Sequence, residues 1–368
     1  MLKFSWVVVV RKPKSLGEVR IKPNHNKKKI IIISVISVVL FLILIGLFYF
    51  LLSINDNGSN KKENVKIDDV NTLDKEDLTV YDANSNKRPI AVMIDNNVGN
   101  NAHVGLQDAY LTYEIIVEGG LTRIMAIFKD VNTSVIGPVR SSRHYFLDYA
   151  LESDAIYAHY GWSTYAENDI RALGVNNING LYDNGYYRNY NIAAPHNVFT
   201  SIEDLYNVAT SKGYSTTSNN YNLLNYTTDD IAFNDTSDLL TANNITMTYS
   251  NSGVRSYTYD ANNRYYLRYM NNSPHTDRDS GLQYHYKNII IMKVNNHTLD
   301  SYGRQDLDTV GNGEGYYITN GYAIPITWNK ASRSDKTHYY YKSGNELVVA
   351  DGNTMIQVVP LNSNIVFS

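Results

Sequence analysis

The chain has 368 residues and no cysteine. The lack of cysteine excludes disulfides, thiolate metal sites, a cysteine nucleophile and lipid attachment to a cysteine. Residues 1–29 carry nine Lys and Arg against one acid, Glu18, which leaves 24 Lys and Arg against 35 Asp and Glu in residues 53–368, a net charge of −11. Such an acidic segment argues against nucleic acid as a partner and confines any anion site to a local cluster of arginines.

The first predicted element is a membrane anchor. Residues 30–52 are an uncharged apolar run of 23 residues that directly follows Lys27, Lys28 and Lys29. At about 1.5 Å per residue the run spans a hydrocarbon core of about 30 Å. It is longer than the core of a cleaved signal peptide and has no Ala-x-Ala pattern, which favours an uncleaved signal anchor. The positive-inside rule puts the basic head, residues 1–29, in the cytoplasm and the rest outside.

A polar stretch, residues 53–86, predicts a flexible linker. Residues 87–225 then alternate strand and helix signals, which predicts an α/β-like extracellular domain. Ser163 is placed to begin one helix, and Thr200 with Glu203 matches a capping box for another, which Gly213 ends. The predicted strands cover residues 90–94, 111–117, 124–128 and 155–160, and the predicted helices cover 141–151, 163–173 and 200–213.

Residues 235–368 predict a mostly β extracellular domain of short strands separated by turn residues. Pro325 lies inside one run and predicts a strand at a sheet edge. The glycine-rich stretch 311–315 predicts a hairpin turn. The runs cover residues 245–249, 256–259, 264–269, 288–294, 315–319, 324–328 and 355–359. The predicted fold class is therefore α+β, an α/β-like domain followed by a mostly β domain, behind a single N-terminal transmembrane helix.

The densest cluster of charged and small residues predicts an anion site. Arg140, Ser141 and Arg143 follow a Gly-Pro pair at the entrance of a predicted helix. Helix N-termini offer unpaired N–H groups and a positive dipole end, and arginine binds phosphate or carboxylate bidentately. The alternative is that these arginines are paired inside the domain with Glu114, Glu118 or Asp148, and that Ser141 only caps the helix.

Other residues are candidates for supporting this site. Arg123 lies in a neighbouring strand, His159 lies where a strand runs into a helix, and His196 lies before a capped helix. Either histidine is suited to acid/base chemistry or anion contact, and the alternative for each is a hydrogen-bonded structural role. Asp95 ends the first strand, where a carboxylate can orient an arginine, bind Mg²⁺ or simply form a turn.

Longer motifs in the chain resemble those of the YerB-like family of Gram-positive envelope lipoproteins, whose two domains are classed as of unknown function. The matching motifs are Arg-Pro-Ile-Ala-Val-Met-Ile-Asp-Asn at 88–96, Val-Glu-Gly-Gly-Leu-Thr-Arg at 117–123, Ile-Gly-Pro-Val-Arg-Ser-Ser-Arg at 136–143, His-Tyr-Gly at 159–161, Ala-Pro-His-Asn at 194–197 and Thr-Trp-Asn-Lys at 327–330. The chain departs from the family in lacking the lipid-bearing cysteine and in the loop at residues 97–105. The resemblance implies an envelope location and a two-domain architecture.

A second resemblance concerns only the layout. The chain is similar in layout to the LytR-CpsA-Psr phosphotransferases, which attach pyrophosphate-linked polymers to peptidoglycan. The shared layout is a cytoplasmic head, one anchor and an exported α/β domain. That domain contains Arg123, a Pro-x-Arg turn ending at Arg140 and an Ala-His-Tyr-Gly segment. This likeness implies that Arg123, Arg140 and Arg143 bind phosphate and that Asp95 helps to hold Mg²⁺.

The sequence thus predicts a single-pass cell-membrane protein whose extracellular part binds an anionic wall component or an envelope protein, with no resident cofactor and no nucleic-acid partner. Two alternatives stay open. One is a phosphotransferase acting on lipid-pyrophosphate-linked wall polymers, the only case that calls for Mg²⁺. The other is a structural scaffold without a small-ligand site. Whether the protein is an enzyme is left undecided.

Overall fold

The structure is a computed structural model that describes residues 78–368 except 221, 234–237 and 251–252. The predicted head, anchor and linker up to residue 77 lie outside the described residues. Within the described ranges no helix is long and apolar enough to cross a membrane. Residues 78–86, assigned to the linker from composition, are packed: Tyr81 is buried, and its hydroxyl donates to Asn222 Oδ1 at 2.5 Å. The folded part therefore begins before residue 87.

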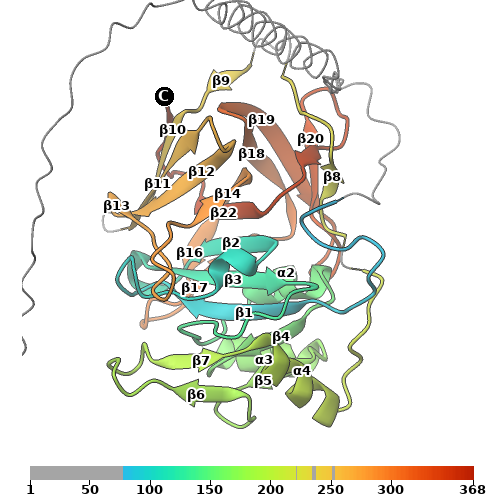
Figure 1. The fold of residues 1–368 in the computed structure, drawn as a ribbon, viewed down its shortest axis with the longest axis vertical. Helices are drawn as coiled ribbons and strands as arrows, with labels where there is room; N and C mark the ends of the chain where they lie inside the picture. The colour runs from blue at the N-terminus through green and yellow to red at the C-terminus, as the bar shows by residue number, and fades with distance from the viewer. Residues whose placement is uncertain (1–77, 221, 234–237, 251–252) are drawn as a thin grey trace, which may run out of the picture. The chain divides into compact units, whose positions relative to one another are not determined.

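An eleven-stranded sheet runs through both halves of the chain (Figure 1). Its halves meet where β2 pairs in parallel with β22, with Leu111 opposite Thr354. The two predicted domains therefore share one sheet. In spatial order the strands are β20 (His338–Tyr341), β19 (Tyr322–Lys330), β18 (Gly311–Thr319), β15 (Asn288–Val294), β22 (Thr354–Pro360), β2 (Leu111–Ile116), β3 (Thr122–Phe128), β1 (Ile90–Asp95), β4 (Ile156–His159) and β5 (Asn177–Asn179), and β9 (Leu240–Thr241) pairs with β19.

The other elements cover this long sheet or extend its edges. A six-stranded sheet has the order β13 (Ser273–Pro274), β12 (Tyr265–Met270), β11 (Gly253–Asp260), β10 (Asn244–Ser250) and β23 (Ile365–Phe367), with β14 (His285–Tyr286) paired to β12. Three two-stranded pairs are β6 (Tyr186–Arg188) with β7 (Val198–Thr200), β8 (Asn225–Thr227) with β21 (Val348–Ala350), and β16 (Asn296–Thr298) with β17 (Gln305–Leu307). The helices of the described ranges are α2 (Phe146–Glu152), α3 (Thr164–Ala172), α4 (Ile202–Ser211) and the 3₁₀ turns η1 (Leu106–Asp108) and η2 (Glu118–Gly120).

Neighbouring residues of β2 explain how both faces of the long sheet are covered. Successive side chains of a strand point to opposite faces. Tyr113 stacks on Tyr149 of α2 at 4.6 Å between ring centroids and donates to Glu152 at 2.7 Å. Glu114 points the other way, to Arg255 and Arg268 of the six-stranded sheet. Because both faces are covered, β1, β2 and β3 are buried along their full length.

The described part is mostly β, so the predicted α+β class is confirmed only in part. The predicted strands at 90–94, 111–117 and 124–128 appear as β1, β2 and β3, and Ser163 caps α3 by accepting from Ala166 N. The cap of α4 is Ser201, one residue later than predicted.

Two local predictions in the second half are wrong. The stretch 311–315 is the start of β18 and not a turn; the actual turn contains Asn320 and Gly321, both with positive φ. Pro325 does not mark an edge strand, because β19 lies between β18 and β20. Pro325 instead occupies a gap: β9 pairs with β19 before it, and β20 pairs only from Ile326 onward, so the absent N–H costs no ladder bond.

Candidate functional site

The carboxyl ends of three parallel strands meet at one edge of the long sheet. Strands β1, β4 and β5 are parallel neighbours and end at Asp95, His159 and Asn179. This edge is the usual place for ligands in open parallel sheets. Arg140 lies between the ends of β1 and β4, because its N–H donates to Met93 O at 2.9 Å and its carbonyl accepts from Tyr160 N at 3.0 Å.

Asp95 brings two of the predicted residues together. It is 2% exposed, and its Oδ2 lies 3.0 Å from Arg140 Nε and 2.7 Å from His196 Nδ1. Because the carboxylate only accepts, Nδ1 of His196 carries the hydrogen and Nε2 is left with a free lone pair. Among the described residues neither Nε2 of His196 nor the terminal amino groups of Arg140 have a hydrogen-bond partner, and both side chains are about a quarter exposed.

A second arginine, Arg188, completes the site and was missed by the sequence analysis. Its Nη1 donates to Asn197 Oδ1 at 2.7 Å, and its guanidinium lies 5.0 Å from the centre of the Tyr160 ring. The β6–β7 hairpin places it there, since Arg188 pairs with Val198, whose carbonyl accepts from Val139 N. No short motif links Arg188 to Arg140. We call the following six residues the carboxyl-edge site: Asp95, Arg140, Tyr160, Arg188, His196 and Asn197.

Arg123 and Ser141 hold the backbone next to this site through hydrogen bonds. Arg123 is buried, and its Nη1 donates to the carbonyl of Ser141 at 2.5 Å. Burial, together with the nearby charge of Arg143, lowers the pKa of Arg123 to about 10. Ser141 donates its hydroxyl to Tyr160 O at 3.0 Å. Both residues thus fix the backbone beside Arg140.

Arg143 lies close by but is occupied. Glu118 accepts from its Nε at 2.5 Å and from its Nη2 at 3.0 Å, and its Nη1 donates to Ser142 O at 2.8 Å. Burial alone would raise the pKa of Glu118, but the hydrogen bonds and charge of Arg143 outweigh it and lower that pKa. The expected helix entrance is also absent here, because α2 begins only at Phe146. The alternative in which an arginine is paired with Glu118 inside the domain therefore applies to Arg143. Arg140 is held instead by Asp95 and by the backbone of Met93 and Tyr160.

His159 is buried, and both of its ring nitrogens have hydrogen-bond partners, so neither is free to contact a ligand of the carboxyl-edge site. Its Nδ1 is 2.8 Å from Gly161 O and its Nε2 is 3.0 Å from Asn177 Nδ2, which fixes the neutral ring with hydrogen on Nδ1. Burial lowers the pKa of His159 to about 4. This geometry corresponds to the structural alternative for this histidine.

Glu114 is the centre of a separate, fully buried charge cluster. Arg255 Nε and Arg268 Nη2 each lie 2.6 Å from its oxygens, and Asn96, Thr122 and Gln357 donate to it as well. Burial would raise the pKa of Glu114, but the charges of the two arginines outweigh it and lower the pKa to about 2.

A chain of hydrogen bonds leads from this cluster to Asp95. Arg268 Nη1 can only donate, so it bonds the bare Nδ1 of His275. The opposite nitrogen of His275 then donates to His103 Nδ1 at 2.8 Å, and His103 Nε2 donates to Asp95 O at 2.6 Å. Burial lowers the pKa of His103 to about 4 and holds the pKa of His275 well below its usual value. The second half of the chain thus positions the end of β1 through neutral histidines.

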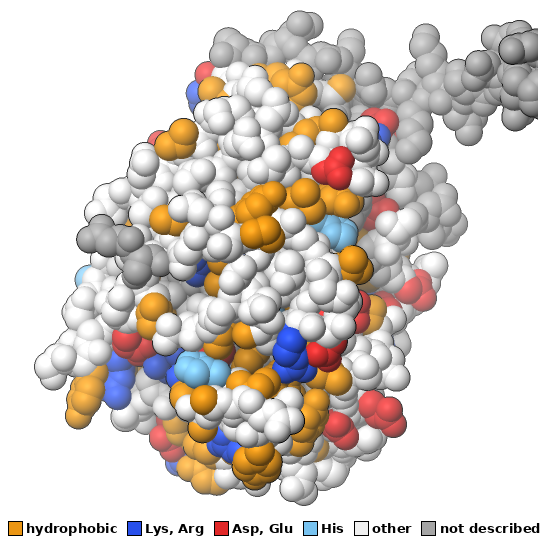
Figure 2. All heavy atoms as spheres, turned by 60° about the vertical axis from the view of Figure 1, so that its left-hand side comes forward, with side chains coloured by type: hydrophobic (Ala, Val, Ile, Leu, Met, Phe, Trp, Pro, Cys, Tyr) orange, Lys and Arg blue, Asp and Glu red, His pale blue; other side chains and the backbone are white. Residues whose placement is uncertain are grey.

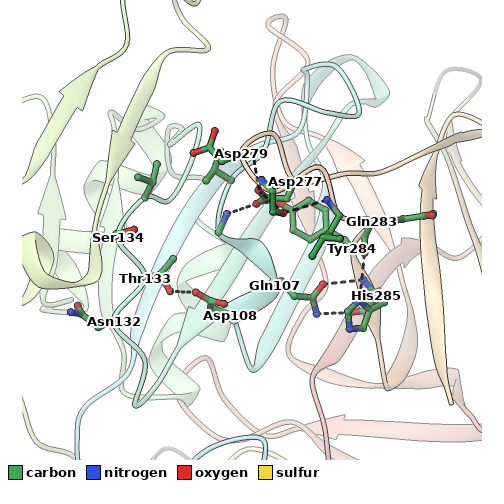
Figure 3. A pocket seen from close by; sticks show the side chains of 15 residues that line it. Gln107, Asp108, Asn132, Thr133, Ser134, Asp277, Asp279, Gln283, Tyr284 and His285 are labelled. Atoms are coloured by element: carbon green, nitrogen blue, oxygen red, sulfur yellow. Dashed lines mark hydrogen bonds between the residues drawn. The ribbon is translucent and has the colours of Figure 1, made fainter. Parts of the chain in front are cut away.

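A pocket of about 470 Å³ lies between η1 and the loop 277–285 (Figure 3). Several of its polar groups are engaged within the fold. Asp277 Oδ2 accepts from Gly105 N at 2.8 Å and from Tyr284 OH at 2.7 Å. Gln107 exchanges two hydrogen bonds with the backbone of His285. The hydrogen bonds around this pocket therefore connect the two halves of the chain. In the carboxyl-edge site, by contrast, some N–H donors have no partner among the described residues.

Charge and aromatic groups gather in the same part of the molecule. Figure 2 shows Lys, Arg and His side chains together with hydrophobic and acidic ones in the lower part of one face, at the height where Figure 1 shows β6 and β7. Elsewhere on that face the surface is mainly uncharged. The basic side chains that an anion site needs are therefore present in this part of the face, beside acidic ones.

Comparison with known proteins identifies the family. Residues 78–215 match "Protein of unknown function (DUF3048) N-terminal domain", and residues 245–356 match the corresponding C-terminal domain. The chain is 31% identical over 282 residues to "Putative lipoprotein YerB" of Bacillus subtilis (strain 168), covering 74% of this chain and 82% of that protein. The crystal structure of YerB protein from Bacillus subtilis superposes with a TM-score of 0.65 at 28% identity, over 82% of this chain and 99% of that one. The resemblance found in the sequence is therefore confirmed: the chain belongs to the YerB-like family, which has two domains of unknown function.

Proposed function

We propose that the protein acts in the cell envelope and binds an oxyanion, phosphate or carboxylate, of a wall component at the carboxyl-edge site. The envelope location is supported by the name of the Bacillus relative, a lipoprotein, and by the apolar run at residues 30–52. In this proposal the run serves as a signal anchor, with the N-terminus in the cytoplasm and the folded part outside.

The single observation that carries the proposal is the unused donor capacity beside Asp95. Arg140 and Arg188 contribute two positive charges against one carboxylate, and each keeps guanidinium N–H groups that no described residue accepts. Arginine in this state suits the planar oxygens of phosphate or carboxylate. A protonated His196 would add a third donor through Nε2.

The test compares the full-length chain with three arginine variants by thermal shift in inorganic phosphate and in pyrophosphate. Arg140→Ala and Arg188→Ala are expected to lose the stabilisation by ligand. The unliganded stability of Arg188→Ala should stay within about 1 kcal/mol of the parent, because Arg188 loses one hydrogen bond to a neutral amide. Arg140→Ala should cost about 1–3 kcal/mol without ligand, because it removes one partner of the buried Asp95, which keeps His196. Arg171→Ala is the matched control, since Arg171 is exposed and, within the described part of the chain, pairs only with Glu167.

Two outcomes would contradict the proposal. If no anion stabilises the parent chain, the site does not bind oxyanions of this kind. If Arg140→Ala and Arg188→Ala both keep the ligand response of the parent, the arginines do not bind the anion, and the scaffold alternative gains support.

A second candidate function, transfer of a phosphoryl group, is favoured by the geometry of His196. A histidine whose Nδ1–H is fixed by a carboxylate, with Nε2 free, has the arrangement of a general base. The Mg²⁺ role suggested for Asp95 does not fit, because its carboxylate already faces Arg140 and His196. His196→Gln separates the two functions: a transferase would lose turnover of pyrophosphate esters while still binding them, and a binding module would show no turnover in either form.

A further inference from the structure

An exposed aromatic turn lies next to the carboxyl-edge site. Tyr182 is 75% exposed and the preceding Leu181 is 52% exposed, and both follow the end of β5. Tyr190, in the loop between β6 and β7 that carries His196, is also highly exposed. Neighbouring exposed apolar side chains of this size on a folded protein mark a contact surface.

A column of rings connects Tyr182 to the core. Tyr157 and His159 are buried, with ring centroids 5.1 Å apart; His159 lies 5.6 Å from Trp162, and Trp162 lies 5.8 Å from Tyr182. The outermost ring is therefore supported from beneath. The column also gives the buried His159 a role, because its two hydrogen bonds fix the plane on which Trp162 packs.

The turn that carries Tyr182 is rigidly built. Asn179 Oδ1 accepts from Gly161 N at 2.9 Å and from Leu181 N at 3.1 Å, and the Asn179 carbonyl accepts from Tyr182 N. Asp183 closes the turn by accepting from Asn179 N and from Lys212 Nζ. A ring held in place before binding loses little conformational entropy when a ligand covers it.

The aromatic turn and the anion donors are adjacent. Tyr160, which lies under Arg188, and Trp162 are separated only by Gly161, and Ser142 N donates to Gly161 O at 2.9 Å. Gly161 has φ +83°, and a Cβ there would lie 3.1 Å from Ser141 Oγ and 3.5 Å from Leu181 Cδ1. The glycine thus lets the Tyr182 turn approach the segment that carries Arg140 and Ser141.

We propose that Tyr182 is a stacking platform for a sugar ring, and that the ligand is an acidic saccharide whose phosphate or carboxylate is bound by Arg140 and Arg188. This inference rests on the proposed anion binding and specifies its ligand. A pyranose has one apolar C–H face and a rim of hydroxyls, which matches an exposed ring flanked by polar groups. A polyanion without rings would gain nothing from Tyr182, and the net negative charge of residues 53–368 would repel it.

The experiment is isothermal titration of the full-length chain with four probes: inorganic phosphate, glycerol 3-phosphate, glucose 1-phosphate and N-acetylglucosamine 1-phosphate. At least one sugar phosphate is expected to bind about tenfold or more tightly than phosphate, and glycerol 3-phosphate, which has no ring, should bind like phosphate. Tyr182→Ala should remove the gain and leave the phosphate Kd unchanged. Tyr182→Phe should keep it.

The control is Tyr302→Ala, because Tyr302 is 77% exposed but lies between β16 and β17 in the other half of the chain. It should bind all four probes like the parent. The stacking platform is contradicted if neither sugar phosphate binds more tightly than glycerol 3-phosphate, or if the higher affinity for a sugar phosphate is kept in Tyr182→Ala. In either case, Arg140-dependent phosphate binding would leave the proposed function intact. If no probe binds in an Arg140-dependent way, the proposed function itself fails.

Discussion

Glu114 of β2 and Arg268 of β12 form an ion pair of 2.6 Å in which both side chains are fully buried. The two residues belong to the two different family domains, 78–215 and 245–356. A buried charge is tolerated only when its partner and hydrogen bonds are in place. The pair therefore makes the folding of one domain depend on the other, in addition to the shared sheet between β2 and β22.

Arg268→Leu is expected to destabilise the protein by about 3–5 kcal/mol, because it leaves Glu114 buried with one of its two arginines and His275 without its donor. Denaturation in urea, followed by tryptophan fluorescence, measures this loss. Arg171→Ala removes an exposed pair and should cost less than about 1 kcal/mol. A loss for Arg268→Leu no larger than that of the control would mean that the cluster does not stabilise the fold.

Stability is expected to fall as the pH drops from about 6.5 to about 4. Burial lowers the pKa of His103 and of His159 to about 4 from 6.5, so in this window the unfolded chain binds protons that the folded chain does not. Stability then rises with pH at about 1.4 kcal/mol per pH unit for each such histidine.

His159→Gln tests this pH dependence through the slope, which a loss of packing does not change. The slope between pH 6 and pH 4.5 should decrease by about 1.4 kcal/mol per pH unit, as measured by urea unfolding at each pH. His297→Gln, at a half-exposed position, is the matched control and should keep the parent slope. An unchanged slope in His159→Gln would show that this histidine is charged in the folded protein.

Much of the fold was predictable where the signal is local. The apolar run that became β1 reads as a strand covered on both faces, and Ser163 is a strong cap for α3. The pairing of β2 with β22 was not predictable, because it joins residues more than 200 positions apart and has no local signal. Arg188 was missed for another reason: the three-residue strands β6 and β7, whose hairpin brings it to Asn197, were not predicted from the sequence.

Several residues of the candidate site were named from the sequence, but the way in which the fold brings them together was not. Asp95, Arg140 and His196 do meet, yet no helix entrance holds them, because the residues before Phe146 pair with strand ends. The glycines at 311–315 misled in a similar way: glycine favours turns, but it also permits close contact in a strand. Gly313 faces the Trp328 ring, which leaves no space for a Cβ.

Gly315→Ala is expected to destabilise the long sheet by about 1–3 kcal/mol or more, because the added Cβ would lie 2.0 Å from the carbonyl oxygen of Ile291 in β15. Gly99→Ala is the control: its Cβ would meet only the side-chain oxygen of Asn101, at 3.3 Å, and should cost little. Thermal unfolding of both variants measures the difference. Equal stability would mean that β18 and β15 can separate without loss.

Alanine substitution of Arg143 and of Arg140 is expected to have opposite effects on phosphate binding, although the two residues are three positions apart. Arg143→Ala removes the bidentate pair with Glu118 and should destabilise the protein by about 1.5–3 kcal/mol while phosphate binding is retained. Arg140→Ala should abolish phosphate binding, because its terminal donors have no partner in the described part of the fold, and should also cost about 1–3 kcal/mol through the lost contact with the buried Asp95. Urea unfolding and phosphate titration on both variants measure the two effects independently. If Arg143→Ala lost binding at unchanged stability, the anion would lie at Glu118 and Arg143, and the carboxyl-edge site would have to be moved there.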